Sequence, residues 1–480
     1  MTNSISSRQR LALAVLLALG LSACASTYRA PALELPVVEP ASAESAPTIL
    51  TEATPELTSW WQSFNDPVLT ALVSEALTHN VDVLSAMQSV EQSRSTLRQA
   101  WLTLLPDISA GGSVTRQQPS DYTAQPGQSG ISNVYSAGFS ASYEIDLWGR
   151  AWKARSAASS QLLASQYARD TVRSSIAAQT ASSYFALLRL DAQLALLQQT
   201  QRTRSEALEL QQVRNRAGVS GDYELQLAQA ELAAIDAQLP ATRSALTQAE
   251  AALAVLLGRS PRAVMSGQIE RGGALQSLAA TPEIPAGLPA DLLVRRPDVR
   301  QAEALLAAAD ASLQETRRRY FPTLGITGFF GNESLTFSTL FDQAARSWNV
   351  AGAVTQPIVG LARTRAQVKA AQAAREQAEL AYAQAARAAY GDVRSALAAH
   401  LAARETLQAT QRRVDNQNRV KAIVEQRYEG GASSYLDLLN AERDRLAAES
   451  ELISALQNRL TALVGVYQAL GGGWDAAAFE

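Results

Sequence analysis

The sequence predicts a mainly α-helical fold with a small β part, built from duplicated long-helix hairpins with four strands per chain. Three observations carry this prediction. The chain repeats itself around matching prolines and glycines, and two runs of roughly 70 residues contain almost no helix breaker. Four shorter segments alternate apolar and polar side chains, as strands with two unlike faces do.

The composition suits long packed helices better than a bulky globular core. Aromatic residues make up only 6% of the 480 residues, and alanines fill many positions where a core would use larger side chains. The formal net charge of −3 and the pI of 5.7 give no sign of the basic surface that nucleic acid requires. We therefore expect no nucleic-acid partner.

The N-terminus decides the predicted compartment. Arg8 and Arg10 precede the apolar run "LALAVLLALGL", which is too short to span a bilayer as a mature helix. "LSAC" follows, and its Cys24 is the only cysteine, so it has no partner for an internal disulfide. The plainer interpretation is a signal peptide that merely contains a cysteine near its end. The sharper one is that "LSAC" resembles a bacterial lipobox, so that residues 1–23 are a lipoprotein signal peptide and Cys24 becomes the lipidated first residue.

A lipid on Cys24 would anchor the chain to a membrane. Buried acyl chains contribute roughly 0.8 kcal/mol per CH₂, so several chains together hold firmly. Ala25 follows the cysteine where Asp would be the alternative, which in that family of signals implies sorting to the outer membrane. Residues 24–56 carry five prolines among Ala, Ser and Glu, which predicts an extended lipidated tether and not a domain.

An internal duplication organises the rest of the chain. "LRQAWLTLLPDISAGGSV" (97–114) is echoed by "LQETRRRYFPTLGITGFF" (313–330), with a proline at the matching place. "AGVSGDYELQLAQAE" (217–231) is likewise echoed by "GGASSYLDLLNAE" (430–442). The predicted parts are a first structural repeat over 57–258, a linker rich in Gly and Pro over 259–289, a second repeat over 290–471 and a C-terminal tail over 472–480.

Each half contains the same helices in the same order. The expected helices are two of about 25 residues that end at a proline (81–105 and 297–321), two long ones (150–217 and 361–429) and two return helices that end near Leu257 and Leu470. At 1.5 Å per residue, a helix of roughly 68 residues reaches about 100 Å and needs partners along its length. The two shorter helices of each half together match that length, so we expect them to stack end to end beside the long one. Pro240 should kink the first return helix without ending it.

Two β-hairpins are predicted, one in each half, over 107–147 and 322–358. In "VYSAGFSASYEIDLW", Tyr135 and Phe139 share one face while serines and Glu144 share the other. Such segments of about ten residues are typical of a membrane β-barrel, although an ordinary antiparallel sheet with one wet face has the same pattern. Four strands cannot close a barrel, and lipid does not tolerate open strand edges. If the strands enter a membrane, three chains of four strands would supply the twelve of one barrel.

The sequence contains no catalytic constellation. It has only two histidines, His79 and His400, no Gly-rich phosphate loop, and one cysteine that is the lipidation candidate. Val393, His400, Leu407 and Val414 recur every seven residues, which predicts a coiled-coil seam and makes His400 a packing residue rather than a ligand. Carboxylates interleave with Arg and Gln in helical register, as on solvated faces. We expect no enzyme, no metal site and no cofactor beyond the covalent lipid.

Four motifs in order give the chain a family resemblance. "EIDLWGR" (144–150), "LLVRRPDVRQAEALLAAADASLQETRRRYFP" (292–322), the duplicated glycine motif and "YQALGGGW" (467–474) together resemble the outer-membrane efflux channel family of TolC and OprM, in its NodT-like lipoprotein branch. The resemblance covers essentially all of residues 24–474. It implies a homotrimer in which a twelve-stranded transmembrane β-barrel continues into an α-helical barrel across the periplasm, anchored to outer-membrane lipid by palmitate-type acylation of Cys24.

The resemblance also implies a function. The chain would be the outer-membrane channel of a tripartite efflux system, a passive duct that conducts small molecules such as drugs from an inner-membrane pump with the help of a periplasmic adaptor. The competing hypothesis is a non-conducting coiled-coil lipoprotein that tethers the periplasm to the outer membrane. That tether explains the anchor and the long helices, but it leaves the four alternating strands without a purpose.

The resemblance places a gate at the hairpin tips. The matching closure positions are Arg427, Tyr428, Leu436, Asp437 and Asn440, and the chain reversals are at Gly218, Gly430 and Gly431. Gly431 is expected to be a left-handed helix cap. Arg427 and Tyr428 are expected to hold neighbouring hairpins together by charge-assisted hydrogen bonds.

Asp437 has two interpretations at this tip. The simpler is a solvated carboxylate near the positive end of a helix. Threefold symmetry would instead place three such carboxylates around one axis, where like charges raise pKa values and attract cations. Two departures from the family pattern concern the same region: some relatives carry an acid where this chain has Asn440, and the first-half tip is two residues longer, with Glu224 as the candidate counterpart of Asp437.

Overall fold

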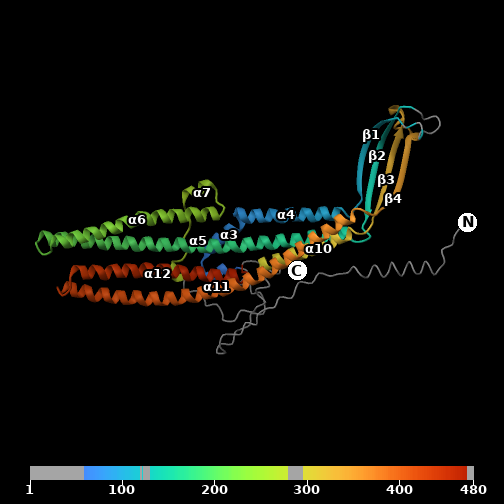
Figure 1. Cartoon of the computed structure of the whole chain (residues 1–480). Helices are drawn as coiled ribbons and strands as arrows, with labels where there is room; N and C mark the ends of the chain where they lie inside the picture. Colours follow the sequence, from blue (N-terminus) through green and yellow to red (C-terminus); the bar gives the residue numbers. More distant parts are fainter. Residues whose placement is uncertain (1–58, 119, 121, 123–129, 279–295, 473–480) are drawn as a thin grey trace, which may run out of the picture. The chain divides into compact units, whose positions relative to one another are not determined.

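A computed structural model describes residues 59–118, 120, 122, 130–278 and 296–472 (Figure 1). Cys24, the predicted signal peptide and the predicted tether lie outside the described residues, as do parts of the linker and of the tail. The chain divides into two compact units. The sheet unit contains the described residues within Thr96–Gln161 and Glu303–Leu380, and the helical unit contains those within Leu35–Ser95, Leu162–Ala302 and Ala381–Glu480.

The sheet unit holds one antiparallel sheet in the order β1-β2-β3-β4. Its strands are β1 (Asp107–Gln117), β2 (Ser132–Ile145), β3 (Thr323–Ser334) and β4 (Arg346–Thr355). Each predicted hairpin therefore forms, and the two hairpins join through β2 and β3. The second hairpin loop, predicted only as polar, contains two short 3₁₀ turns, η3 (Phe337–Thr339) and η4 (Gln343–Ala345).

The register confirms the two unlike faces of the sheet. Ala110 pairs with Phe139, Phe139 with Phe330, and Phe330 with Trp348, so these residues form one row across all four strands. The three aromatic side chains of this row are exposed in the single chain. Serine, threonine and glycine dominate the other face, as the alternation predicts.

One glycine pair fixes how β2 meets β3. Gly138 lies opposite Gly331, and the ring of Phe329 lies beside both of them. A Cβ atom on Gly138 would come within 2.6 Å of the Phe330 carbonyl oxygen, and one on Gly331 would come within 2.4 Å of the Ala137 carbonyl oxygen. Since neither backbone can move without breaking the ladder, only glycine fits at these two places.

The helices confirm the predicted plan of long rods with shorter partners. They are α3 (Pro67–His79), α4 (Val81–Leu102), α5 (Arg150–Arg216), α6 (Asp222–Leu256), α7 (Pro261–Ser266), α8 (Leu275–Leu278), α10 (Pro297–Arg318), α11 (Leu361–Glu429) and α12 (Tyr435–Ala469). α5 and α11 contain 67 and 69 residues. Pro240 lies inside α6, which continues past it. α7 and α8 are helices that the sequence analysis assigned to the linker.

Hydrogen bonds within the helical unit confirm the end-to-end stacking. Asn80 precedes α4, and its side-chain amide donates to the Leu256 carbonyl at the end of α6, over 2.8 Å. In the second half, Arg296 precedes α10 and donates to the Ala469 carbonyl at the end of α12, over 3.0 Å. The duplication therefore extends to how each half joins its two shorter helices.

The predicted seam on α11 is also present. Val414 is buried, and the other three seam residues are half-buried (Val393, His400 and Leu407). Leu407 packs against the main hydrophobic cluster of the helical unit. Among the described residues, no helix is long and apolar enough to cross a membrane.

The helical unit contains a bulky core that the composition argued against. The 3₁₀ turn η2 (Trp60–Phe64) brings three aromatic side chains into this core, and the ring of Trp60 stacks on Tyr467 with centroids 5.5 Å apart. Asp66 follows this turn, and its buried carboxylate accepts hydrogen bonds from the Leu69 amide and from the Tyr184 hydroxyl. The expectation was wrong because a low average content of aromatic residues does not exclude their clustering at one place.

Candidate functional site

Both helical hairpins of the chain turn in the same way. α5 ends just before Gly218, whose φ is 72°, and α11 ends just before Gly431, whose φ is 75°. The Val219 amide donates to the Arg214 carbonyl over 2.8 Å, and the Ala432 amide donates to the Arg427 carbonyl over 2.7 Å. This six-residue closure with a left-handed glycine confirms the predicted cap at Gly431 and its repeat at Gly218.

Gly430 directly follows the last residue of α11, Glu429. Its amide donates to the Gln426 carbonyl over 3.1 Å, and the next amide, of Gly431, donates to the Tyr428 carbonyl over 3.0 Å. The chain then enters α12 at Tyr435. In Figure 1 the α5–α6 loop and the α11–α12 loop lie at the same end of the helical unit.

Tyr428 links the two hairpins of one chain. Its hydroxyl accepts hydrogen bonds from the Gln211 side-chain amide over 3.0 Å and from the Arg214 guanidinium over 2.6 Å, both from α5. The Arg214 guanidinium also lies 5.4 Å from the centre of the Tyr428 ring. Gln211 is only 1% exposed, so this contact is shielded from water.

Asp437 closes the first turn of α12. One of its carboxylate oxygens accepts from the Ser434 amide over 2.9 Å, while the Ser434 hydroxyl accepts from the Asp437 amide over 3.1 Å, which makes a capping box. Hydrogen bonds from the Ser434 hydroxyl and amide lower the pKa of Asp437, and the positive charge of Arg427 lowers it further. Within one chain the carboxylate is therefore held in its ionised form.

The remaining predicted gate residues lie on the surface of the same tip. Arg427 is exposed, Leu436 is 38% exposed, and Asn440 is exposed with its side-chain oxygen 3.5 Å from the Arg443 guanidinium. Tyr435, which neighbours Leu436, is buried, and burial raises the pKa of its hydroxyl. The structure thus brings all five positions to one tip, with Tyr428 in contact with the other hairpin.

Two further charge pairs join the hairpins, and the sequence analysis missed them. Arg443 of α12 pairs with Glu231 of α6, with its Nε 3.0 Å from the carboxylate. Arg204 of α5 pairs with Glu442 of α12, and its side chain is almost fully buried. A signal was present: Glu231 and Glu442 end the two copies of the repeated glycine motif, so both copies supply an acid at the same place.

The first tip is similar in plan but differs in its cap. Glu224 is the third residue of α6, as Asp437 is of α12, so the two carboxylates occupy matching helical positions. Gly221 caps α6 without any side-chain hydrogen bond, whereas Ser434 caps α12. The capping box that fixes Asp437 is therefore specific to the second tip.

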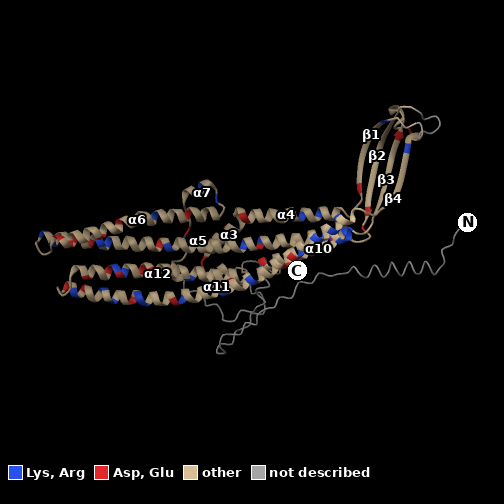
Figure 2. Cartoon of the chain, in the orientation of Figure 1, with Lys and Arg blue, Asp and Glu red and all other residues tan. Residues whose placement is uncertain are grey.

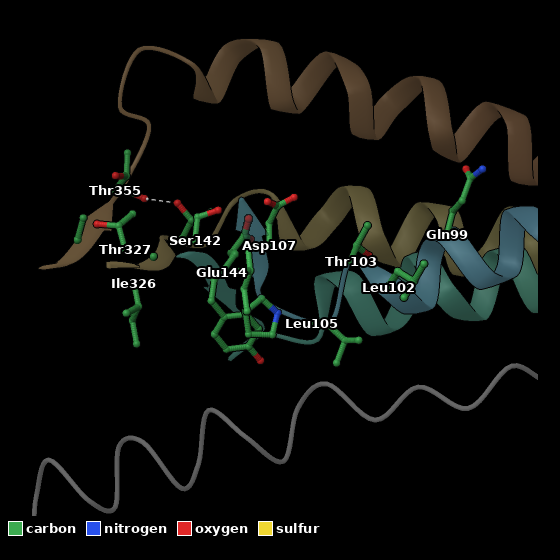
Figure 3. Close-up of a pocket in the computed structure, with 16 residues that line it drawn as sticks. Gln99, Leu102, Thr103, Leu105, Asp107, Ser142, Glu144, Ile326, Thr327 and Thr355 are labelled. Carbon is green, nitrogen blue, oxygen red and sulfur yellow. Dashed lines mark hydrogen bonds between the residues drawn. The ribbon is translucent and has the colours of Figure 1, made fainter. Parts of the chain in front are cut away.

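A cavity of about 820 Å³ lies at the foot of the sheet (Figure 3). Its lining combines polar side chains, among them Ser142, Glu144 and Thr327, with apolar ones, among them Leu102, Leu105 and Ile326. Hydroxyl and carboxylate groups supply the polar part of this wall, and apolar side chains supply the rest. Among the described residues, no group of His, Cys, Asp and Glu could hold a metal ion.

Comparison with known proteins decides the family. The outer membrane efflux protein family matches residues 72–259 and 288–472. The chain belongs to the outer membrane efflux protein family. The pyoverdine export outer membrane protein OpmQ of Pseudomonas putida is 31% identical over 96% of this chain and 97% of its own length.

Solved structures agree with this assignment to the efflux channels. The CmeC outer membrane channel of Campylobacter jejuni superposes with a TM-score of 0.81 at 25% identity, covering 93% of this chain and 95% of that one. The open state of the MtrE outer membrane channel of Neisseria gonorrhoeae superposes with a TM-score of 0.77 at 29% identity, covering 92% and 98%. This efflux channel is thus an outer-membrane component of an efflux system and extends into the periplasm. Its relatives are channel proteins and not enzymes.

Proposed function

We propose that the channel is a homotrimer whose hairpin tips form a gate, opened in a complex with a periplasmic adaptor and an inner-membrane pump. Three chains supply twelve strands, which close a barrel and remove the open edges of β1 and β4. The same symmetry gathers six hairpin tips around one opening. The two repeats, 57–258 and 290–471, then contribute equivalent hairpins to one helical duct.

The single observation that supports a gate at this tip is the contact between Tyr428 and its two partners on α5. A helix hairpin tip that only reversed the chain would need no bond to the other hairpin. Here a buried glutamine and an arginine hold the Tyr428 hydroxyl, and two charge pairs add to the link farther along α12. Hydrogen bonds to charged groups contribute roughly 1.5 to 3 kcal/mol each, which is enough to bias a two-state opening.

Leu436, Asp437 and Asn440 complete the proposed gate. Leu436 and Asp437 are exposed at the tip and free to face the opening, where three copies would set its width and its charge. Arg427 stands beside Asp437 and moderates that charge. Asn440 stands where some relatives have an acid. The α11–α12 tips of three chains therefore contribute one ring of carboxylates to the proposed opening, that of Asp437.

The cargo is proposed to consist of small molecules. The name of OpmQ attributes pyoverdine export to that relative, and the hydroxyl and carboxylate groups at the foot of this sheet suit contact with soluble solutes. A passive duct selects weakly, so the pump is expected to determine which molecules pass.

Current through a planar bilayer tests the duct. Purified full-length protein should insert and give steady ionic current in equal steps, because each trimer contributes one opening. A structural tether with the same anchor and helices would bind the membrane without any steady current, and that result would reject the proposal.

Acylation of Cys24 is a separate proposal with its own test. Cells that express the wild-type chain should incorporate labelled palmitate into it, whereas Cys24→Ala should incorporate none. A signal peptide that merely contains a cysteine would leave the wild-type chain unlabelled as well.

A further inference from the structure

All four connections between strands and helices expose large apolar side chains. These four connections, here called the elbows, carry Leu102 at the end of α4 and Leu105 after it, Leu147 and Trp148 before α5, Phe321 after α10, and Ile358 and Val359 before α11. Ile358 is 79% exposed and Val359 is 92% exposed in the single chain. Such a recurring set of exposed apolar side chains marks a surface that contacts something apolar.

The central elbows are rigid. The ring of Trp148 stacks on Phe321 with centroids 4.9 Å apart, and its indole NH donates to the Pro322 carbonyl over 2.7 Å. The Arg318 guanidinium donates in turn to the Trp148 carbonyl over 2.7 Å. These contacts join β2 to β3, the two inner strands, so β1 and β4 remain available for pairing with neighbouring chains.

Basic side chains follow the elbows directly. Residues 150–168 contain Arg150, Lys153 and Arg155 and no acid, and residues 361–374 contain Arg363, Arg365 and Lys369 and no acid. Figure 2 shows further Lys and Arg near the end of α10, where Arg317, Arg318 and Arg319 stand together. The last turn of a helix favours basic side chains, which accounts for Arg317 and Arg318. The first turn favours acidic side chains, so α5 and α11 do not explain the cations near their starts.

Most of these cations are not neutralised within the sheet unit. Arg150 pairs with Glu144 and Glu315, and Arg319 pairs with Glu315. In the described part of the unit, no carboxylate pairs with Lys153, Arg155, Arg363, Arg365 or Lys369. Arg155 lies instead over the ring of Trp152, 5.1 Å from its centre.

We propose that the elbows and the cations that follow them form a binding surface for anionic phospholipids of the periplasmic leaflet of the outer membrane. Acyl chains would contact the elbow side chains, and phosphates would contact the cations. The orientation follows from the helices, which leave the sheet at this end and extend into the periplasm. The proposal rests on the trimeric barrel of the proposed function.

Lipid binding to the purified full-length channel tests the surface. The channel in detergent is titrated with phosphatidylglycerol or phosphatidylcholine of identical acyl chains, and native mass spectrometry counts the lipids bound per trimer. The wild-type channel should bind phosphatidylglycerol more tightly than phosphatidylcholine. The combined variant Lys153→Gln, Arg155→Gln, Arg363→Gln and Arg365→Gln should lower its apparent affinity at least about tenfold, because each cation near an anionic surface adds to the attraction.

A matched control variant removes the same number of positive charges from the part of α11 that lies in the helical unit. Arg387→Gln, Arg394→Gln, Arg412→Gln and Arg419→Gln change four exposed cations of the helical unit and should leave the lipid preference unchanged. Ile358→Asn with Val359→Asn should weaken the binding of both lipids, because the acyl contacts are lost.

Three results would overturn the lipid surface. They are equal binding of the two lipids by the wild type, an equal loss in both charge variants, or full binding after the two elbow asparagines, which would indicate a site for phosphate alone. Bilayer current separates this test from that of the proposed function. Elbow variants should still conduct as trimers, whereas a wild type without current refutes the duct whatever its lipid preference.

Discussion

The Tyr428 hydroxyl on α11 accepts a hydrogen bond from the Arg214 guanidinium on α5 over 2.6 Å. The two residues are separated by 214 positions in sequence. Their contact joins the second hairpin to the first at the end of the helical unit where both hairpins turn. If the tips open by separating hairpins, this bond must break first.

Tyr428→Phe should therefore increase single-channel conductance. The substitution removes the acceptor of both Arg214 and the buried Gln211, and losing a charge-assisted hydrogen bond in each chain costs the closed state about 1.5 to 3 kcal/mol. Tyr435→Phe is the matched control, because the buried Tyr435 hydroxyl has no hydrogen-bond partner among the described residues. Planar-bilayer recording compares the two. Arg427→Ala should also raise conductance. Unchanged conductance in both Tyr428→Phe and Arg427→Ala would remove the gate from this tip.

The charge pairs allow a second comparison, between a pair that joins the two hairpins and a pair that lies inside one hairpin. Arg443→Ala breaks the pair with Glu231, which joins α12 to α6, and should favour the open state. Arg413→Ala breaks the pair with Glu451, which joins α11 to α12 inside one hairpin, and should leave conductance unchanged.

The double variant Glu231→Arg with Arg443→Glu should restore wild-type conductance, since it rebuilds the pair in reverse. Equal conductance in the Arg443→Ala and Arg413→Ala channels would show that the link between hairpins does not control opening.

The positions of glycine and proline in the sequence made the long helices predictable. α5 and α11 begin and end within about one residue of the expected limits, because these runs contain no proline and only one glycine, Gly391. The strands were predictable because their two faces differ along every segment. The tip reversals at Gly218 and Gly431 followed from the repeat.

The partners of these elements were not predictable in the same way. Nothing local in α5 indicates that Gln211 and Arg214 meet Tyr428, because that contact depends on how two long helices are placed against one another. The stacking of Trp60 on Tyr467 likewise joins the two ends of the described chain. Composition averages over the whole sequence, so it conceals such a local core.

Asp437 gives a prediction for pH. The hydrogen bonds from Ser434 lower its pKa in the folded chain, so their stabilisation is complete above the unfolded value of about 3.9 and is lost as the pH falls below it. Cation selectivity of the wild-type channel should then stay constant from pH 8 to pH 5, while Asp437→Asn should reduce it throughout. Reversal potentials in a salt gradient measure both. A loss of selectivity between pH 7 and pH 5 would mean that three neighbouring carboxylates raise the pKa more than Ser434 lowers it.

The pairing of β2 with β3 gives a prediction for assembly. Gly138→Ala would place a methyl group 2.6 Å from the Phe330 carbonyl oxygen and 2.9 Å from the Phe329 ring, so the strands must separate or slip. Overpacking of this kind typically costs about 1 to 3 kcal/mol per chain, and a trimer has three copies of the site. The temperature at which the trimer dissociates in detergent should therefore fall for Gly138→Ala. Gly325→Ala is the control on the same face, since no atom lies within 4 Å of its added Cβ. If both variants dissociate at the wild-type temperature, the glycine pair does not limit the stability of the barrel.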